Sequence, residues 1–221
     1  ELPQSLLLRL NLIRAYEAQD KNDEALAVSN DILKTQPDQV NTLDLHSELL
    51  LKKGDSAKAL AAMEKAYSLV PANLTLGYKL LYQYAESKNP KTILLADSLI
   101  AKDSLKLHAE PYYVKGIYYS NINEKAKAIE SFNETIRQDY NYLNAYIEKG
   151  KILFDQKKVP EAFKAFQTAN SIDPAFADAW YWMAKCQELS GQKEDAKLNY
   201  EKAYALDKSF TEAKEAAERI K

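Results

Sequence analysis

Hydrophobic residues follow a helical spacing along the chain, in consecutive stretches of about three to four turns. Tyr146, Gly150 and Leu153 are four and three residues apart, so they share one side of a helix that we expect from Leu143 to Gln156. A second stretch follows after a short polar turn, from Pro160 to Ile172, and proline is compatible with the first turn of a helix. The pattern therefore predicts an all-α chain of antiparallel helix pairs.

The helix pair recurs with a period of about 34 residues. Alanines that follow the turns are separated by 34, 69, 34 and 34 residues, at Ala25, Ala59, Ala128, Ala162 and Ala196. Four of the five glycines occupy two repeat positions, at Gly116 and Gly150 and at Gly54 and Gly191. The period predicts six repeats in one solenoid domain, followed by a capping helix at 211–221. The repeats are 6–39, 40–73, 74–108, 109–142, 143–176 and 177–210.

Close packing explains the small residues at these positions. Two helices joined by a short turn must cross closely, so we expect Gly150 to face Ala162 at the crossing of the fifth repeat. Larger residues four places after the alanines, such as Phe166, fill the remaining volume. One helix pair cannot bury its hydrophobic face alone, whereas stacked neighbours can.

The third repeat, 74–108, departs from the pattern. It has an extra residue, no glycine at its turn, and Ile93 or Leu94 where the other repeats have alanine. Leu80, Tyr84 and Leu95 keep a helical spacing, so we still expect a helix pair there, with altered boundaries.

The segment from Ala177 through Gly191 to Ala203 resembles a tetratricopeptide repeat, and so does the segment from Gly54 to Pro71. The resemblance covers about 6–210. It implies a right-handed superhelix in which the first helix of each pair, helix A, lines a concave groove and helix B lies on the convex side. It also implies a protein-interaction scaffold, because members of this family act mainly in that way.

Charge and composition exclude several other classes. The 30 basic and 32 acidic residues give a net charge of −2, without the basic surface by which proteins bind nucleic acid. The longest uncharged stretch, Ala66 to Tyr78, is too short to span a bilayer and contains Pro71. The chain begins without an initiator Met, so we expect a soluble protein, cytoplasmic or periplasmic after removal of an upstream segment.

Residues for catalysis or metal binding do not converge in the sequence. The single cysteine, Cys186, excludes an internal disulfide and is expected to be buried within its helix. His46 and His108 fall at unrelated repeat positions, and no phosphate-binding loop or serine elbow is present. The sequence therefore predicts a protein that is not an enzyme and needs no metal or cofactor.

The residues that line the groove can be derived from the side of helix A that packs on helix B. If Tyr146, Gly150 and Leu153 pack inward, the neighbouring face carries Asn144, Ile147, Lys151 and Phe154. The corresponding residues of the second and third repeats are polar and mixed in sign, and include Asp44, Glu48 and Lys79. Those of the fourth repeat are Glu110, Tyr113 and Ile117, and those of the sixth are Asp178, Tyr181 and Lys185.

Hydrophobic residues on a face that should be exposed to solvent indicate a site of contact with a partner. The predicted partner-binding residues are therefore Tyr113, Ile117, Asn144, Ile147, Lys151, Tyr181 and Lys185. Among the tyrosines, Tyr112, Tyr119 and Tyr146 are expected in the core, whereas Tyr113 should point away from it. The alternative interpretation is that Ile117 and Ile147 only pack between adjacent A helices.

The sequence thus predicts a scaffold that binds a protein or peptide in its groove, with no role for nucleic acid or membrane insertion. Chaperone-binding relatives hold a C-terminal carboxylate with a fixed set of Lys, Asn and Arg, and the corresponding positions counted from the first, third or fourth repeat do not carry that set. The alternative function is a structural or self-assembly module of a larger protein or complex, with self-association as its signature.

Overall fold

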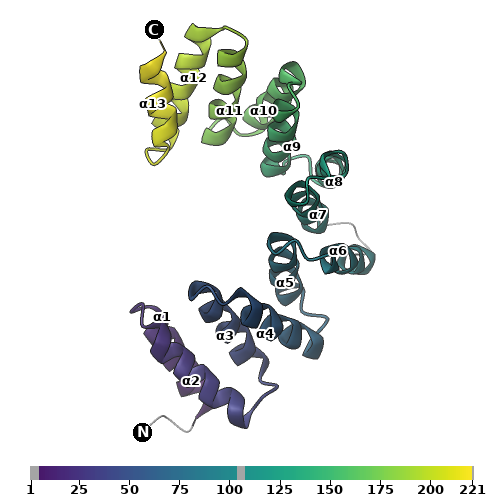
Figure 1. Ribbon diagram of the computed structural model, residues 1–221, viewed down its shortest axis with the longest axis vertical. Helices are drawn as coiled ribbons and strands as arrows, with labels where there is room; N and C mark the ends of the chain where they lie inside the picture. Colours follow the sequence, from purple (N-terminus) through teal and green to yellow (C-terminus); the bar gives the residue numbers. More distant parts are fainter. Residues whose placement is uncertain (1–4, 104–107, 221) are drawn as a thin grey trace. The chain divides into compact units, whose positions relative to one another are not determined.

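The computed structural model describes residues 5–103 and 108–220, and over these residues the chain is built from helices, with no strand (Figure 1). The chain divides into two compact units, an N-terminal unit that ends at Leu99 and a C-terminal unit that begins at Ile100. The first six helices are α1 (Leu6–Glu17), α2 (Asn22–Thr35), α3 (Val40–Lys52), α4 (Ser56–Leu69), α5 (Leu74–Glu86) and α6 (Lys91–Lys102). The others are α7 (Glu110–Asn121), α8 (Lys125–Gln138), α9 (Leu143–Asp155), α10 (Val159–Ile172), α11 (Ala177–Leu189), α12 (Lys193–Leu206) and α13 (Thr211–Arg219).

Consecutive helices pair, and consecutive pairs stack within each unit. In the C-terminal unit α7 pairs with α8, α9 with α10 and α11 with α12, and α13 packs on α12 (Figure 1). The expectation of an all-α solenoid of antiparallel helix pairs is confirmed. In the fifth repeat the observed helices begin and end within one residue of the predicted ones.

The turn inside each pair explains one of the two glycine positions. One residue of each turn is left-handed, with φ between 55° and 79°, at Asp20, Gly54, Lys88, Asn123, Lys157 and Gly191. In every turn the next N–H group donates to the carbonyl five residues earlier, at 2.8–2.9 Å, which is the Schellman arrangement that ends a helix. Glycine adopts this conformation without a steric cost, but the hydrogen bond also forms where the residue is lysine.

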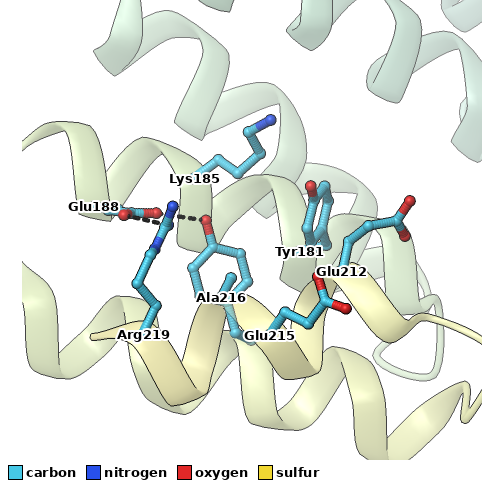
Figure 2. A pocket seen from close by; sticks show the side chains of 8 residues that line it. Tyr181, Lys185, Glu188, Glu212, Glu215, Ala216 and Arg219 are labelled. Atoms are coloured by element: carbon cyan, nitrogen blue, oxygen red, sulfur yellow. Dashed lines mark hydrogen bonds and ion pairs between the residues drawn. The ribbon is translucent and has the colours of Figure 1, made fainter. Parts of the chain in front are cut away.

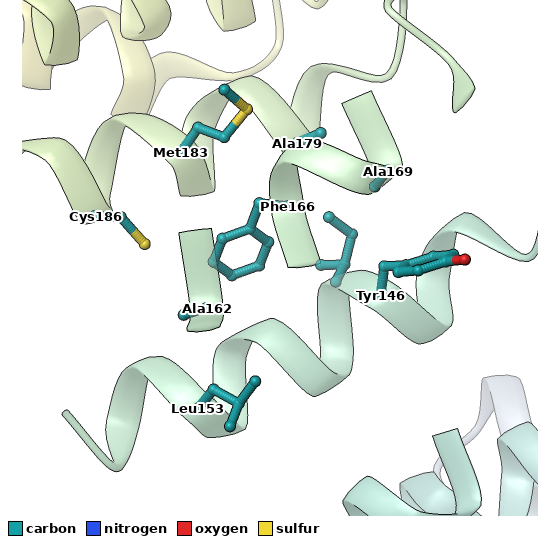
Figure 3. Close-up of a cluster of buried hydrophobic side chains, with 9 residues drawn as sticks. Tyr146, Leu153, Ala162, Phe166, Ala169, Ala179, Met183 and Cys186 are labelled. Carbon is teal, nitrogen blue, oxygen red and sulfur yellow. The ribbon is translucent and has the colours of Figure 1, made fainter. Parts of the chain in front are cut away.

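The second glycine position accommodates an aromatic ring. A Cβ atom on Gly150 would lie 2.3 Å from Cε1 of Phe166, and one on Gly116 would lie 2.4 Å from Cε1 of Phe132. Figure 3 shows Phe166 in the middle of a buried cluster that also contains Tyr146. The missing side chain of Gly150 therefore makes room for the phenylalanine one turn after Ala162, rather than for Ala162 itself.

The third repeat keeps its helix pair but shifts the phase of its second helix. The small buried residue of α6 is Thr92, four residues after the left-handed Lys88, whereas the alanines of the other repeats follow at five. Ala96 and Leu99 continue the buried side of α6, and Leu94 is 74% exposed. The prediction that Ile93 or Leu94 replaces the alanine is therefore wrong. α6 begins at Lys91, three residues after the left-handed residue, whereas the second helices of the other repeats begin two residues after it. A different set of its residues therefore faces the core.

The last helix covers the end of the sixth repeat. Ala213, Ala217 and Ile220 are buried in one cluster with Tyr200 and Ala203 of α12. The charged residues of α13, among them Lys214 and Glu218, are exposed. α13 thus packs one hydrophobic side on α12 and exposes a charged side, and its role as a capping helix stays a prediction.

The close contact at Gly150 generates a first prediction. Replacing Gly150 by Ala should lower the free energy of unfolding by about 1–3 kcal/mol, because the new methyl group overlaps the Phe166 ring. At an ordinary helical position the same change raises stability by about 1 kcal/mol. Urea unfolding followed by circular dichroism measures the difference. The loss should shrink in a Phe166→Leu background, and a stabilising Gly150→Ala would contradict the contact.

The left-handed turns generate a second prediction. Lys157 has φ of 64°, so replacing it by Gly should raise the free energy of unfolding by about 0.5–1 kcal/mol, because the strain of a side chain in this region is removed. The neighbouring Lys158 has φ of −86°, and Lys158→Gly is the matched control that should be destabilising. Equal effects of the two variants would show that Lys157 is not left-handed in solution.

Candidate functional site

An aromatic residue that the groove prediction omitted, Trp182 on α11, lies at the centre of the candidate site. Its ring stacks on Phe166 with centroids 5.6 Å apart and planes 22° apart. Phe154 of α9 and Tyr181 contact it nearly edge-on, at 5.9 and 5.7 Å. Trp182 is half-buried, so three neighbouring rings fix its orientation while part of it stays accessible.

Two of the predicted lysines converge on this tryptophan. The Nζ atom of Lys185 lies 4.6 Å from the centroid of the Trp182 ring, and that of Lys151 lies 5.5 Å from it. Lys151 also pairs with Glu148, with 2.8 Å between Nζ and Oε1. Lys185 lies over Tyr181 and Phe154 as well, at 5.4 and 5.9 Å, and has no ion pair among the described residues. We call Lys151, Phe154, Tyr181, Trp182 and Lys185 the Trp182 cluster.

Tyr113 packs against the hydrophobic cluster around Phe132, contrary to expectation. Its ring lies 5.7 Å from Phe132 and 4.9 Å from Tyr142, so the prediction that it points away from the core is wrong. Burial raises the pKa of Tyr113 to about 12, and the charges of Glu148 and Glu110 add to this. A helix in a stack is contacted by its own partner and by the next repeat, so its buried side is wider than one stripe.

The two isoleucines follow the same rule. Ile147 is 3% exposed in the cluster around Phe166, and the prediction that it contacts a partner is wrong. Ile117 is half-buried against the cluster that contains Phe132. The interpretation that these residues pack between helices fits both of them. Asn144, by contrast, is exposed on α9.

A cavity of about 470 Å³ adjoins the Trp182 cluster, between α11, α12 and α13 (Figure 2). Its lining consists of Tyr181, Lys185, Glu188, Tyr200, Glu212, Glu215, Ala216 and Arg219.

Part of the charge in this cavity is paired internally. Glu188 accepts hydrogen bonds from the Tyr200 hydroxyl at 2.9 Å and from Nη2 of Arg219 at 2.6 Å. Burial and Glu188 both raise the pKa of Tyr200 well above its usual range. The sequence held no signal for this cavity beyond the repeat position of Tyr181 and Lys185, because α13 supplies half of its wall.

The polar residues predicted for the groove face of the second and third repeats form ion pairs with one another. Nζ of Lys79 on α5 lies 2.8 Å from Oδ2 of Asp44 and 2.6 Å from Oε1 of Glu48, both on α3. The three charges satisfy one another, so this part of the N-terminal unit offers little unpaired charge to a partner.

Other titratable groups are held in structural contacts. Nδ1 of His46 lies 2.9 Å from Oγ of the buried Ser29, and burial lowers the pKa of His46. His108 pairs with Asp103, with 3.1 Å between Nδ1 and Oδ2. Among the residues that the structure describes, no group of three potential ligands could hold a metal ion. No helix in the described part of the chain is long and apolar enough to cross a membrane.

Comparison with family models places this geometry in a known class. Models of the tetratricopeptide repeat match residues 41–73, 113–175 and 153–198, which together cover more than half of the chain. The chain belongs to the tetratricopeptide repeat family. Proteins of this family generally act as scaffolds for interactions between proteins rather than as enzymes.

Relatives of known structure share the fold at low sequence identity. A tetratricopeptide repeat protein from Parabacteroides merdae is 18% identical with a TM-score of 0.70, over 96% of this chain and 82% of that one. PilW, a type IV pilus biogenesis factor, is 16% identical with a TM-score of 0.71, over 96% of this chain and 97% of that one. A curated relative, the DnaJ homolog subfamily C member 7 homolog of Schizosaccharomyces pombe, is 22% identical over 94% of this chain. The chain spans 40% of that relative's length.

The burial of Cys186 generates a prediction that depends on pH. Cys186 is 1% exposed, and burial raises its pKa to about 12. A thiol with that pKa is ionised in only about one molecule in 10,000 at pH 8, and the thiolate is the reactive form. Ellman's reagent at pH 8 should therefore react slowly with the native tetratricopeptide protein and promptly with the protein unfolded in guanidinium. A prompt reaction of the native protein would contradict the packing between α10 and α11.

Proposed function

We propose that this tetratricopeptide protein binds an acidic segment of a partner protein through the Trp182 cluster of its C-terminal unit. The observation that carries the proposal is the ammonium group of Lys185, which lies over three aromatic rings without an ion pair among the described residues. A partner carboxylate would give this group the charge-assisted hydrogen bond that its own chain does not supply.

The order already present around Trp182 favours binding. Its ring is packed on Phe166, Phe154 and Tyr181 in the free protein, so little side-chain freedom remains to be lost when a partner covers it. Tryptophan and tyrosine with one accessible face are frequent anchors of protein interfaces. Lys151 is already paired with Glu148, so we expect it to contribute less than Lys185.

The neighbouring surface supports an extended ligand. Asn144 is exposed on α9, and its amide can bond to the backbone of a segment that passes over the A helices. YrrB, which has this fold, is described as a tetratricopeptide repeat protein with an unusual peptide-binding site; it is 18% identical, with a TM-score of 0.55, over 86% of this chain and 97% of that one. Self-association stays a prediction.

The test compares two matched Trp–Lys pairs of the same unit. Peptides of twelve residues selected from a random display library on the whole chain serve as ligands, and fluorescence anisotropy measures their dissociation constants. Trp182→Phe with Lys185→Met should weaken binding about tenfold, because one anchor face and one charge are lost. The control is Trp180→Phe with Lys202→Met, a pair in which Nζ lies 4.2 Å from the ring centroid, outside the Trp182 cluster.

The control should change the dissociation constants less than about twofold. Circular dichroism must show that both variants keep their helical content. Selected peptides that lack acidic residues, or that bind the Trp182 variant as well as the natural protein, would contradict the proposal.

A further inference from the structure

The cavity between α11, α12 and α13 carries an excess of negative charge on one side. Arg219 and the Tyr200 hydroxyl already bond to Glu188, on one side of the cavity. Figure 2 shows Glu212 and Glu215 on the other side, next to the Tyr181 ring. Both carboxylates are exposed on α13, and neither has an ion pair or hydrogen bond among the described residues.

The tyrosine ring between these carboxylates is held in place. Tyr181 packs on Phe210, with centroids 4.6 Å apart, and on Tyr200, at 5.6 Å. Burial raises the pKa of Tyr181, and the charges of Glu212 and Glu188 raise it further, although Arg219 acts in the opposite direction. The two carboxylates thus affect the pKa of this phenol more than the nearby guanidinium does.

An aromatic face beside two unpaired carboxylates fits one chemical group in particular. A guanidinium is planar, stacks on aromatic rings and donates two parallel hydrogen bonds to a carboxylate. The cavity already contains one such pair in Arg219 and Glu188. Its volume of about 470 Å³ lies within the range of ligand pockets, roughly 300–1,000 Å³.

We propose that this cavity binds an arginine side chain of the partner segment, between the Tyr181 ring and the carboxylates of Glu212 and Glu215. The inference rests on the proposed function, because the segment reaches the cavity from the Trp182 cluster. Lys185 is four residues after Tyr181 on α11, about 6 Å along the helix axis, and in Figure 2 its ammonium points away from α13. The preferred ligand therefore has an arginine close to an acidic residue.

The direct test uses a small probe and does not require a known partner. N-acetyl-L-arginine amide is titrated into the ¹⁵N-labelled whole chain, and amide shifts of Tyr181, Lys185 and Ala216 are followed. N-acetyl-L-citrulline amide has nearly the same shape without the charge. Glu212→Gln with Glu215→Gln removes the two carboxylates and keeps their size. Glu161→Gln with Glu194→Gln removes two exposed charges elsewhere in the C-terminal unit and is the matched control.

Arginine amide should shift these resonances with a dissociation constant at least about fivefold lower than that of citrulline amide, and the Glu212/Glu215 variant should abolish the difference. The Glu161/Glu194 control should keep it. Equal binding of the two probes to the natural protein, or retention of the preference in the Glu212/Glu215 variant, would overturn the inference.

The selected peptides separate this inference from the proposed function. Substituting citrulline for arginine in a bound peptide should weaken its binding to the natural protein and not to the Glu212/Glu215 variant. Peptides that depend on Trp182 and Lys185 but show no arginine preference would refute the arginine site and leave the acidic-segment function intact. Arginine-amide binding in a protein that selects no acidic peptide would refute the function alone.

Discussion

The contact between the Phe166 ring and the bare backbone of Gly150 is the constraint on which the candidate site depends. It lets α9 and α10 approach closely enough for the ring to occupy the position of a missing Cβ atom. The other side of the same ring stacks on Trp182 of the next repeat. The crossing of α9 and α10 therefore sets the position of Trp182 in the next helix pair. The position of Trp182 in turn sets how the surrounding rings and lysines are arranged. Stability and the proposed binding should therefore be coupled, because both depend on the same side chain.

The two units stabilise their helix stacks by different interactions. In the N-terminal unit, ion pairs join the first helices of successive repeats, as between Lys52 on α3 and Glu17 on α1 and between Lys79 on α5 and Asp44 on α3. In the C-terminal unit, aromatic contacts such as that of Phe154 with Trp182 make such connections, alongside the ion pair of Arg219 with Glu188. Lys127 and Lys151 pair with glutamates three residues earlier in the chain. Exposed ion pairs weaken with added salt, whereas ring packing does not. The aromatic unit is thus the one that can hold a charged surface in a fixed geometry at physiological ionic strength.

The repeats, the turns and most of the helices could be predicted from the sequence. The 34-residue period is visible at positions where the local backbone or packing requires a particular type of residue. Glycine at positions 54 and 191 fits a left-handed turn, and glycine at 116 and 150 fits a crowded crossing. A further periodic signal was available at Asp139, Asp173 and Asp207. Each accepts a hydrogen bond at 2.9 Å from the N–H group two residues later, at the junction between repeats.

Residues of the site were harder to predict, because a helical face in a stack is shared between a neighbour and solvent. One step away from the packing stripe, Ile147 is buried by the next repeat whereas Lys151 and Lys185 reach the surface. The sequence predicts all three residues in the groove, because they lie on the same predicted face of helix A. Only the packed structure shows which of them are buried and which are accessible. Trp182 was missed for the converse reason: it lies between two predicted positions and becomes prominent only when Phe166 is placed against it.

The charges on α11 and α13 favour one orientation of a ligand on the proposed surface. Lys185 offers a positive group over the aromatic rings, and Glu212 and Glu215 offer negative groups beyond Tyr181. A ligand with a single charge can satisfy only one end of this arrangement, and reversing a two-charge ligand places like charges together at both ends. Discrimination between the two orientations therefore combines the attraction of the correct ligand with the repulsion of the reversed one.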